Sequence, residues 1–311
     1  MWTLTGFLFH TAAIANPNRV HADHMQQFGG ATPLETATRR RTGAPPPAPD
    51  VTVYGYHPYW GADPTELDFS RLTHLAIFNV DLNSDGTLSD THRWTDVAGD
   101  VVPLAHAEGV SVQLCVTSFD DDVMASVLPD SDRRATAIAE LVSLVEAYDA
   151  DGINVDFEGL DYSLKDDFTT FIQELYPLVS ELTIAMPAVD WSGAYDFDEL
   201  ALSSDGLFIM GYGYHWTGGN PGPGDPLHES DLWGAYSLEW SVNDYLTWGA
   251  TADKLILGLP LYGNEWPTAS DAIPGTATDE GWAVVMSSAD QISSDEGRLW
   301  DDASLSPYVM R

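Results

Sequence analysis

The sequence predicts an α/β fold in which repeated β-α units surround a parallel sheet. From residue 51 onward, short β-branched or apolar runs alternate with longer amphipathic stretches, which is typical of such units. Residues 51–311 also have about the size of a (β/α)8 barrel, which typically takes about 250 residues. A doubly wound open sheet is the alternative. It ranks second, because no G-x-G-x-x-G phosphate loop follows the first predicted strand.

The individual elements follow from hydrophobic periodicity. The helix predicted over residues 133–148 places Ala137, Leu141 and Leu144 on one stripe, and Ser131 or Asp132 is expected to cap it. A second helix is predicted over residues 164–178. Seven strands are predicted, one fewer than a closed barrel has, at residues 51–56, 73–80, 110–117, 152–157, 182–188, 206–212 and 254–261.

Residues 1–50 are expected to form a leader and a Pro-rich linker. Residues 1–16 are moderately apolar but lack a positive n-region, so they make a weak signal peptide. The three arginines at 39–41 precede Thr-Gly-Ala-Pro-Pro-Pro instead of an apolar segment, which favours a linker over a twin-arginine signal. The predicted barrel domain therefore covers residues 51–311.

Charge and composition exclude several kinds of partner. Lys and Arg total 12 against 48 Asp and Glu, a formal charge of −36 that repels nucleic acid and anionic lipid. The single cysteine, Cys115, excludes an internal disulfide and any site built from several thiolates. No apolar run reaches the roughly 18 to 20 residues of a membrane span. The nine histidines lack H-x-x-x-H spacing, so neither a metal nor another cofactor is predicted.

The most informative stretch is Asp-Gly-Ile-Asn-Val-Asp-Phe-Glu-Gly at residues 151–159. Because side chains alternate along a strand, Asn154, Asp156 and Glu158 project from one face and apolar residues from the other. A buried parallel strand is normally apolar on both faces, so this polar row indicates a functional site. Glu158 comes last, at the C-terminal rim where barrel enzymes keep their chemistry.

The two carboxyl groups are expected to influence each other. Same-face residues lie roughly 6.5 Å apart along a strand, and bent side chains can bring Asp156 and Glu158 closer. Two carboxyls that close do not both ionise readily, so one is expected to hold a proton near neutral pH, as a general acid must. The alternative is a solvated acidic edge. The intervening Ile, Val and Phe argue against it, because they indicate a buried strand.

On these residues the sequence resembles glycoside hydrolase family 18, the chitinases and their relatives. The family motif D-G-x-x-x-D-x-E matches residues 151–158, and the strand-six motif M-x-Y matches Met210 and Tyr212. The His215-Trp216-Thr-Gly-Gly extension is similar to the branch of bacterial spore-cortex and cell-wall glucosaminidases. Residues 54–60 and 254–263 resemble the family's first and seventh strands.

The resemblance implies a chitinase-type (β/α)8 barrel, here ending before strand eight and therefore predicted to be seven-stranded and incompletely closed. It also implies hydrolysis of β-linked N-acetylglucosamine polymers, chitin or peptidoglycan, with retention and without an enzyme nucleophile. By position, Glu158 would act as general acid and base, Asp156 would orient the 2-acetamido group, and Tyr212 would donate a hydrogen bond to it. Asp151 and Asn154 would be supporting residues.

Further substrate contacts are expected at the barrel mouth, where aromatic residues after strands suit sugar stacking. A non-catalytic, lectin-like barrel is the alternative function. The protein is expected to be a monomer that binds a polysaccharide or oligosaccharide, with an extracellular or cell-envelope location. The predicted substrate-binding residues are Tyr56, Trp60, Met210, Asp190, His215, Trp216 and Tyr262.

Overall fold

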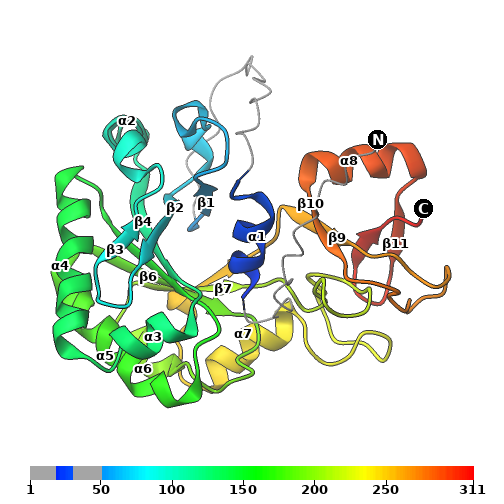
Figure 1. The fold of residues 1–311 in the computed structure, drawn as a ribbon. Helices are drawn as coiled ribbons and strands as arrows, with labels where there is room; N and C mark the ends of the chain where they lie inside the picture. Colours follow the sequence, from blue (N-terminus) through cyan, green and yellow to red (C-terminus); the bar gives the residue numbers. More distant parts are fainter. Residues whose placement is uncertain (1–18, 31–50) are drawn as a thin grey trace, which may run out of the picture.

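The computed structural model describes residues 19–30 and 51–311. Seven parallel strands form one curled sheet in the order β1-β2-β4-β5-β6-β7-β8, and the short β3 pairs antiparallel with β2 (Figure 1). Within the described residues β1 and β8 do not pair with each other. The predicted seven-stranded, incompletely closed barrel is therefore confirmed. The strands are β1 (Tyr54–Pro58), β2 (His74–Leu82), β3 (Leu88–Asp90), β4 (Ser111–Ser118), β5 (Gly152–Phe157), β6 (Glu181–Pro187), β7 (Gly206–Met210) and β8 (Leu255–Gly258).

Helices cover the outer face of this sheet. Their apolar stripes and the outward side chains of the strands form one large core, to which β5 contributes Ile153, Val155 and Phe157. The helices are α2 (Trp94–Ala107), α3 (Asp121–Val127), α4 (Ser131–Ala147), α5 (Lys165–Leu175), α6 (Phe197–Leu202) and α7 (Leu238–Thr247). Short 3-10 helices lie at Pro64–Glu66, Phe69–Arg71, Tyr162–Leu164, Tyr176–Leu178 and Ala252–Lys254. No helix in the described ranges is long and apolar enough to cross a membrane.

The element boundaries agree closely with the sequence pattern at the centre of the sheet and less well at its edge. The strand predicted at 152–157 has these bounds in the structure, whereas the last predicted strand, 254–261, shortens to Leu255–Gly258. Pro260 has no N–H to donate to a ladder, which is consistent with the early end. The helix cap is also corrected. Asp130, not Ser131 or Asp132, accepts from the main-chain N–H groups of residues 132 and 133.

After β8 the chain builds a small lobe beside the barrel mouth (Figure 1). Two antiparallel hairpins and one helix form it, and β10 follows directly into that helix. The lobe consists of β9 (Tyr262–Glu265), β10 (Trp282–Val285), α8 (Met286–Glu296), β11 (Leu299–Asp301) and β12 (Ser306–Tyr308).

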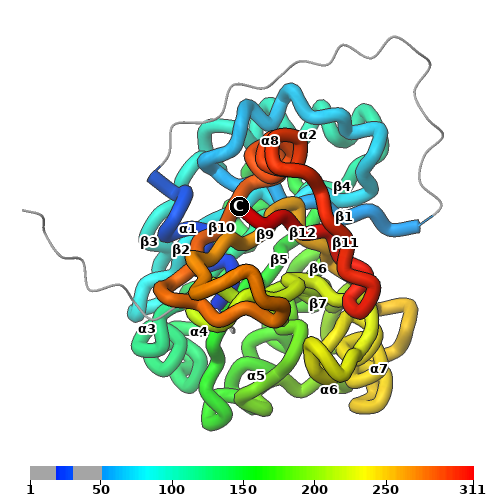
Figure 2. The backbone as a smooth tube through the Cα atoms, turned by 90° about the vertical axis from the view of Figure 1, so that its right-hand side faces the viewer, coloured from blue at the N-terminus to red at the C-terminus, as the bar shows by residue number. Residues whose placement is uncertain are grey.

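One helix, α1 (Val20–Phe28), comes from the predicted leader. It lies between the barrel mouth and the lobe, beside β10, although more than 250 residues separate the two in sequence (Figures 1 and 2). Residues 1–18 and 31–50 of the predicted leader and linker lie outside the described residues.

Candidate active site

The site is built on β5, which lies between β4 and β6 in the middle of the sheet. Asn154 pairs in register with Cys115 of β4 and with Thr183 of β6, and Asp156 pairs with Thr117. Glu158 follows the strand, and its main-chain N–H still donates to the carbonyl of Ser118 at 3.1 Å. The predicted row of Asn154, Asp156 and Glu158 therefore runs along the inside of the barrel toward its C-terminal rim.

Asp156 and Glu158 are almost completely removed from solvent, with 0% and 1% of their surface exposed. Burial raises the pKa of Glu158 well above its usual value, and the nearby carboxylate of Asp156 raises it further. Main-chain N–H groups of His21 and Ala22 oppose this shift in pKa. The Oδ1 atom of Asp156 is buried and has no hydrogen-bond partner. The pair thus combines a carboxyl that favours its protonated form with an unused acceptor.

Asn154 is held by three neighbours inside the barrel. Its Oδ1 accepts from the hydroxyl of Tyr56 at 3.0 Å and from the thiol of Cys115 at 3.3 Å, while its Nδ2 donates to Thr183 Oγ1 at 2.9 Å. Asn154 and Cys115 are fully buried. The hydroxyl of Tyr56 therefore donates its proton to Asn154, the residue of the polar row that precedes Asp156 on the same face of β5.

Tyr212 lies two residues after the end of β7 and faces the same interior. Burial raises its pKa well above 10, and Tyr262 and Asp156 add to the shift, so the phenol keeps its proton. Its ring belongs to a small buried cluster with Met210 and Phe208, against which Tyr262 packs. Tyr212, at the end of β7, and Asp156 and Glu158, at the end of β5, thus face the same interior across β6, while their predicted roles stay predictions.

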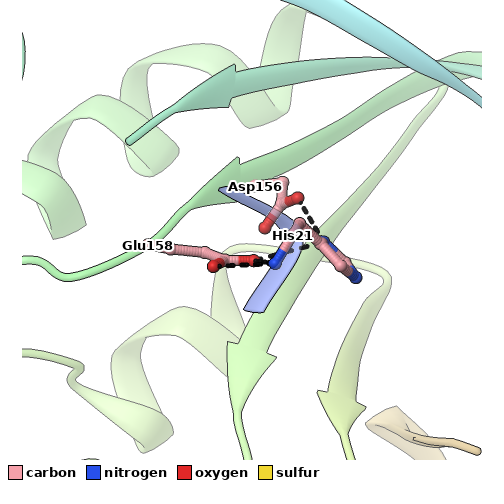
Figure 3. A group of neighbouring side chains, drawn as sticks. All are labelled: His21, Asp156 and Glu158. Atoms are coloured by element: carbon pink, nitrogen blue, oxygen red, sulfur yellow. Dashed lines mark hydrogen bonds and ion pairs between the residues drawn. The ribbon is translucent and has the colours of Figure 1, made fainter. Parts of the chain in front are cut away.

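His21 of α1, which the sequence analysis did not single out, contacts all three of these residues, and Figure 3 shows it beside Asp156 and Glu158. Its main-chain N–H donates to both carboxylate oxygens of Glu158, at 3.0 and 3.2 Å. Its Nδ1 lies 2.6 Å from Asp156 Oδ2 and its Nε2 lies 2.7 Å from the Tyr212 hydroxyl. The two ring nitrogens of His21 therefore face a carboxylate oxygen on one side and a phenolic hydroxyl on the other.

His21 also completes a set of possible metal ligands. One atom each from His21, Asp156 and Glu158 lies within 4.8 Å of the others, a grouping of nitrogen and carboxylate oxygens that transition metals accept. The Nδ1 atom of His21 and Asp156 Oδ2 are also within hydrogen-bonding distance of each other, at 2.6 Å. The absence of a metal stays a prediction.

Aromatic side chains and a cavity surround α1 at the barrel mouth. The cavity measures about 240 Å³ and is lined by α1, by Trp216 and by the β9–β10 hairpin with Tyr262 and Trp282. The buried hydroxyl of Tyr262 has no hydrogen-bond partner. On the opposite side Trp60 packs edge-on against Phe78. Two of the predicted stacking residues, Trp216 and Tyr262, therefore line one hollow, and Trp60 lies apart from it.

The remaining predicted residues have local partners. Both carboxylate oxygens of Asp190 accept from main-chain N–H groups between residues 193 and 195, which fixes the loop after β6. His215 Nδ1 lies 3.0 Å from the carbonyl of Pro223, and the His215 ring contacts Trp233. Asp151 lies at the other end of β5 from Glu158, where it accepts from Val112 N and His106. Their predicted roles toward substrate stay predictions.

The family model described as Glycosyl hydrolases family 18 matches residues 52–311. A putative sporulation-specific glycosylase, YdhD, of Bacillus subtilis is 28% identical over 175 residues, covering 53% of this chain and 39% of that protein. A chitinase-like effector of Moniliophthora roreri is 26% identical over 274 residues, covering 79% of this chain and 66% of that protein.

Solved structures show the same fold. A family 18 chitinase from Cycas revoluta in complex with (GlcNAc)3 matches with a TM-score of 0.74 at 19% identity, covering 83% of this chain and 84% of that one. The chain spans only about two fifths to a half of the length of the first curated relatives it matches. The family model nevertheless covers nearly all of the chain after residue 51, and the chain belongs to glycosyl hydrolases family 18.

Proposed function

We propose that the protein hydrolyses a glycan containing β-linked N-acetylglucosamine, with the substrate's own acetamido group as the nucleophile. The observation that carries the proposal is the buried Asp156–Glu158 pair at the rim of β5, with the pKa of Glu158 raised by burial and by Asp156. A carboxyl with this pKa remains protonated where ordinary carboxyls are ionised, which is the requirement for a general acid.

In the first step the Glu158 carboxyl gives its proton to the glycosidic oxygen while the acetamido carbonyl oxygen attacks C1. The C1–oxygen bond breaks, the leaving sugar departs as an alcohol, and an oxazolinium ion remains. In the second step water attacks C1, the bond between C1 and the acetamido oxygen breaks, and the Glu158 carboxylate takes a proton from the water and returns to the acid form. One residue thus acts as acid and then as base.

Asp156 and Tyr212 would hold the acetamido group during these steps. The unpartnered Oδ1 of Asp156 is suited to accept the acetamido N–H, and the Asp156 charge lies next to the positive charge that develops on the ring. Tyr212 keeps its phenolic proton and is suited to donate to the acetamido oxygen. Both groups are fixed before the reaction, so little reorganisation accompanies the transition state.

The glycan is either chitin or peptidoglycan. The similarity to chitinases favours chitin, whereas the similarity to the Bacillus glycosylases and the His215-Trp216 extension favour a wall glycan. Either polymer would be met outside the cytoplasm, which suits an extracellular or cell-envelope location. Trp216 and Tyr262, beside the mouth cavity, are suited to stack against sugar rings.

The test is release of reducing ends from N-acetylglucosamine oligomers and from purified peptidoglycan by the unchanged protein and by Glu158→Gln. Glutamine keeps the shape of the side chain but has no acidic proton, so hydrolysis is expected to fall by roughly 10²- to 10⁴-fold. Oligomer binding is expected to persist. Equal rates in both proteins would remove Glu158 as the acid. Binding with no hydrolysis in either protein would favour the lectin-like alternative.

A further inference from the structure

We propose that residues 19–30 form an autoinhibitory segment: docked in the cleft, it covers the Asp156–Glu158 pair, and glycan reaches Glu158 only when the segment leaves. The inference rests on the proposed function, because that function identifies the glycan as the molecule that the segment excludes from the cleft. The docking itself is a property of described residues of α1, the barrel and the lobe.

The first argument is that a single residue of the segment uses the groups that substrate would need. The main-chain N–H of His21 binds the Glu158 oxygens, and its ring binds Asp156 Oδ2, at distances of 2.6 to 3.2 Å (Figure 3). The other nitrogen of the ring lies 2.7 Å from the Tyr212 hydroxyl. A sugar ring and its acetamido group would have to occupy this same space. Substrate and segment therefore exclude each other.

The second argument is that the segment is anchored along its whole length. Arg19 pairs with Asp121 of α3, and the side chain of Met25 packs against the inner cluster that contains Phe78 and Cys115. The Gln27 amide forms two hydrogen bonds with the main chain of Ala283 in β10, of 2.8 and 3.1 Å. These anchors reach both the barrel and the lobe, so the segment bridges the mouth.

Two glycines leave space for the segment at its entrance. Gly159, directly after Glu158, has φ +75°, and a Cβ there would collide with the Arg19 side chain. Gly213, directly after Tyr212, has φ +77°, and a Cβ there would come within 3.0 Å of Val20. The positive φ values favour glycine in any case. Because these two glycines have no side chains, there is room for the side chains of Arg19 and Val20 directly after the two proposed catalytic residues.

Docking of the segment buries two titratable side chains, Asp23 and His24, and this burial opposes docking. Burial raises the pKa of Asp23 to about 6, with a contribution from Glu280, and lowers the pKa of His24 to about 3. Both shifts in pKa mean that the docked position favours the neutral side chain over the carboxylate of Asp23 and over the imidazolium of His24. A helix of nine residues is also marginal by itself in water, so the docked form depends on its contacts.

The principal test compares hydrolysis of an N-acetylglucosamine tetramer by the unchanged full chain and by His21→Ala. The substitution removes two hydrogen bonds to the cleft but leaves the helix and the proposed catalytic residues in place. Loss of such bonds shifts the docking equilibrium by about tenfold or more, and hydrolysis is expected to rise by up to that factor. Gln26→Ala, which changes an exposed residue of the same helix, is the matched control and should leave the rate unchanged.

A lower rate in His21→Ala would overturn the proposal, because it would make His21 part of the machinery. An unchanged rate would overturn it as well. Circular dichroism and the thermal midpoint establish that each variant is folded. Glu158→Gln in the His21→Ala background should abolish the added hydrolysis, which assigns the gain to the site and not to a contaminant.

A second test fixes the segment in its docked position. Arg19→Cys and Asp121→Cys place two thiols where the ion pair joins α1 to α3, and a short, reducible bifunctional thiol reagent can connect them. The buried Cys115 is not accessible to the reagent. The crosslinked protein is expected to lose hydrolysis and to regain it on reduction. Full hydrolysis by the crosslinked form would contradict the proposal. Each single-cysteine variant, treated in the same way, is the control.

Binding separates failure of this inference from failure of the proposed function. If no variant hydrolyses the tetramer, the proposed function fails, and the inference is then decided by tetramer binding followed through tryptophan fluorescence. Tighter binding by about tenfold in His21→Ala and weaker binding in the crosslinked form would support an occluding segment. Equal affinities in all forms would overturn it.

Discussion

The two faces of β5 differ completely in chemistry, although they alternate residue by residue. On the outer face Ile153, Val155 and Phe157 pack into the large core beneath the helices. On the inner face Asn154 and Asp156 form a polar row, which Glu158 continues just beyond the end of the strand. Both faces are equally buried, so burial alone does not distinguish them.

The difference teaches that stability and chemistry are assigned to opposite sides of one backbone. The outer side chains contribute apolar surface removed from water, at about 25 cal/mol per Å². The inner carboxyls oppose folding, because a buried charge is costly unless it is protonated or paired. Substitutions on the outer face should therefore change the free energy of unfolding. Substitutions of the inner carboxyl groups, Asp156 and Glu158, should change chiefly the reaction.

The largest effect is expected for Phe157→Ala on the outer face. The Phe157 ring is fully buried and stacks on Phe171 at 5.6 Å between ring centres, next to Phe168. Its loss should lower the free energy of unfolding by about 3 to 5 kcal/mol, measured in denaturant. The folded fraction should retain its hydrolytic rate. Tyr162→Ala, an exposed aromatic residue, is the control and should change stability by no more than about 0.5 kcal/mol.

If Phe157→Ala kept its free energy of unfolding but lost its rate of hydrolysis, the assignment of stability to the outer face and chemistry to the inner face would be wrong. The hydroxyl of Tyr195 donates to the carbonyl of Phe157 at 2.6 Å and does not involve the phenyl ring, so this contact should survive. The position of Glu158 should therefore be maintained.

The next largest effect is expected for Asp156→Asn on the inner face, measured in the His21→Ala background so that weaker docking of α1 does not obscure it. Removing a fixed charge beside the developing positive charge should lower hydrolysis by roughly 10²- to 10³-fold, or about 3 to 4 kcal/mol. The pKa of Glu158 should also fall toward its usual value, because Asp156 is one cause of its rise. The alkaline limit of the remaining activity should move to lower pH.

The same substitution predicts a change in stability with pH. The pKa of Glu158 is raised in the folded protein, so the native state holds a proton that the unfolded state releases above about 4.5. Its contribution to stability is complete below that value and is lost as pH rises toward the folded pKa. This loss should be smaller in Asp156→Asn. Asp166→Asn, at an exposed site in α5, should leave it unchanged. An unaltered loss in Asp156→Asn would show that burial alone sets the pKa.

The sequence predicted β5 and its row correctly because the information is local. A strand alternates with period two, so six consecutive residues are enough to assign Asn154 and Asp156 to one face. The order of the parallel strands also follows from the repeated β-α units. The cap of α4 was displaced by one residue, because Asp130, Ser131 and Asp132 are consecutive and all suitable.

The position of α1 could not be predicted, because none of its informative contacts is local. His21 reaches Glu158 and Tyr212 across 137 and 191 residues of sequence. Its helix is short and within a segment whose composition resembles a leader. His21 and His24, at helical spacing, were the only visible signal, and two histidines three residues apart are common on unrelated helices.

A smaller effect is expected for Asn154→Ala, which tests whether an uncharged residue of the inner row contributes to stability. The substitution leaves the hydroxyl of Tyr56 without its acceptor, whereas Thr183 loses one partner and keeps its contacts with Gln113 and Tyr54. Buried groups left unpaired cost about 1 to 3 kcal/mol. The free energy of unfolding should fall by that amount, with a smaller loss of activity than in Asp156→Asn.

A double-mutant cycle with Tyr56→Phe identifies the bond responsible. Phenylalanine removes the donor, so the double variant should be more stable than the sum of the two single losses predicts. Strict additivity would mean that Tyr56 and Asn154 do not stabilise each other.

The smallest effect is expected for Cys115→Ala, beside Asn154 on the neighbouring strand. The thiol is fully buried and acts mainly as a small apolar group, so its removal should cost about 1 kcal/mol of unfolding free energy. Asn154 keeps its bonds to Tyr56 and Thr183, and hydrolysis should be unchanged. Burial, with the charges of Asp156 and Glu158, raises the thiol's pKa well above 9. The native protein should therefore resist a thiol reagent that labels it after unfolding. Rapid labelling of Cys115 in the native protein would contradict this expectation, because it would mean that the inner face of the sheet opens to solvent.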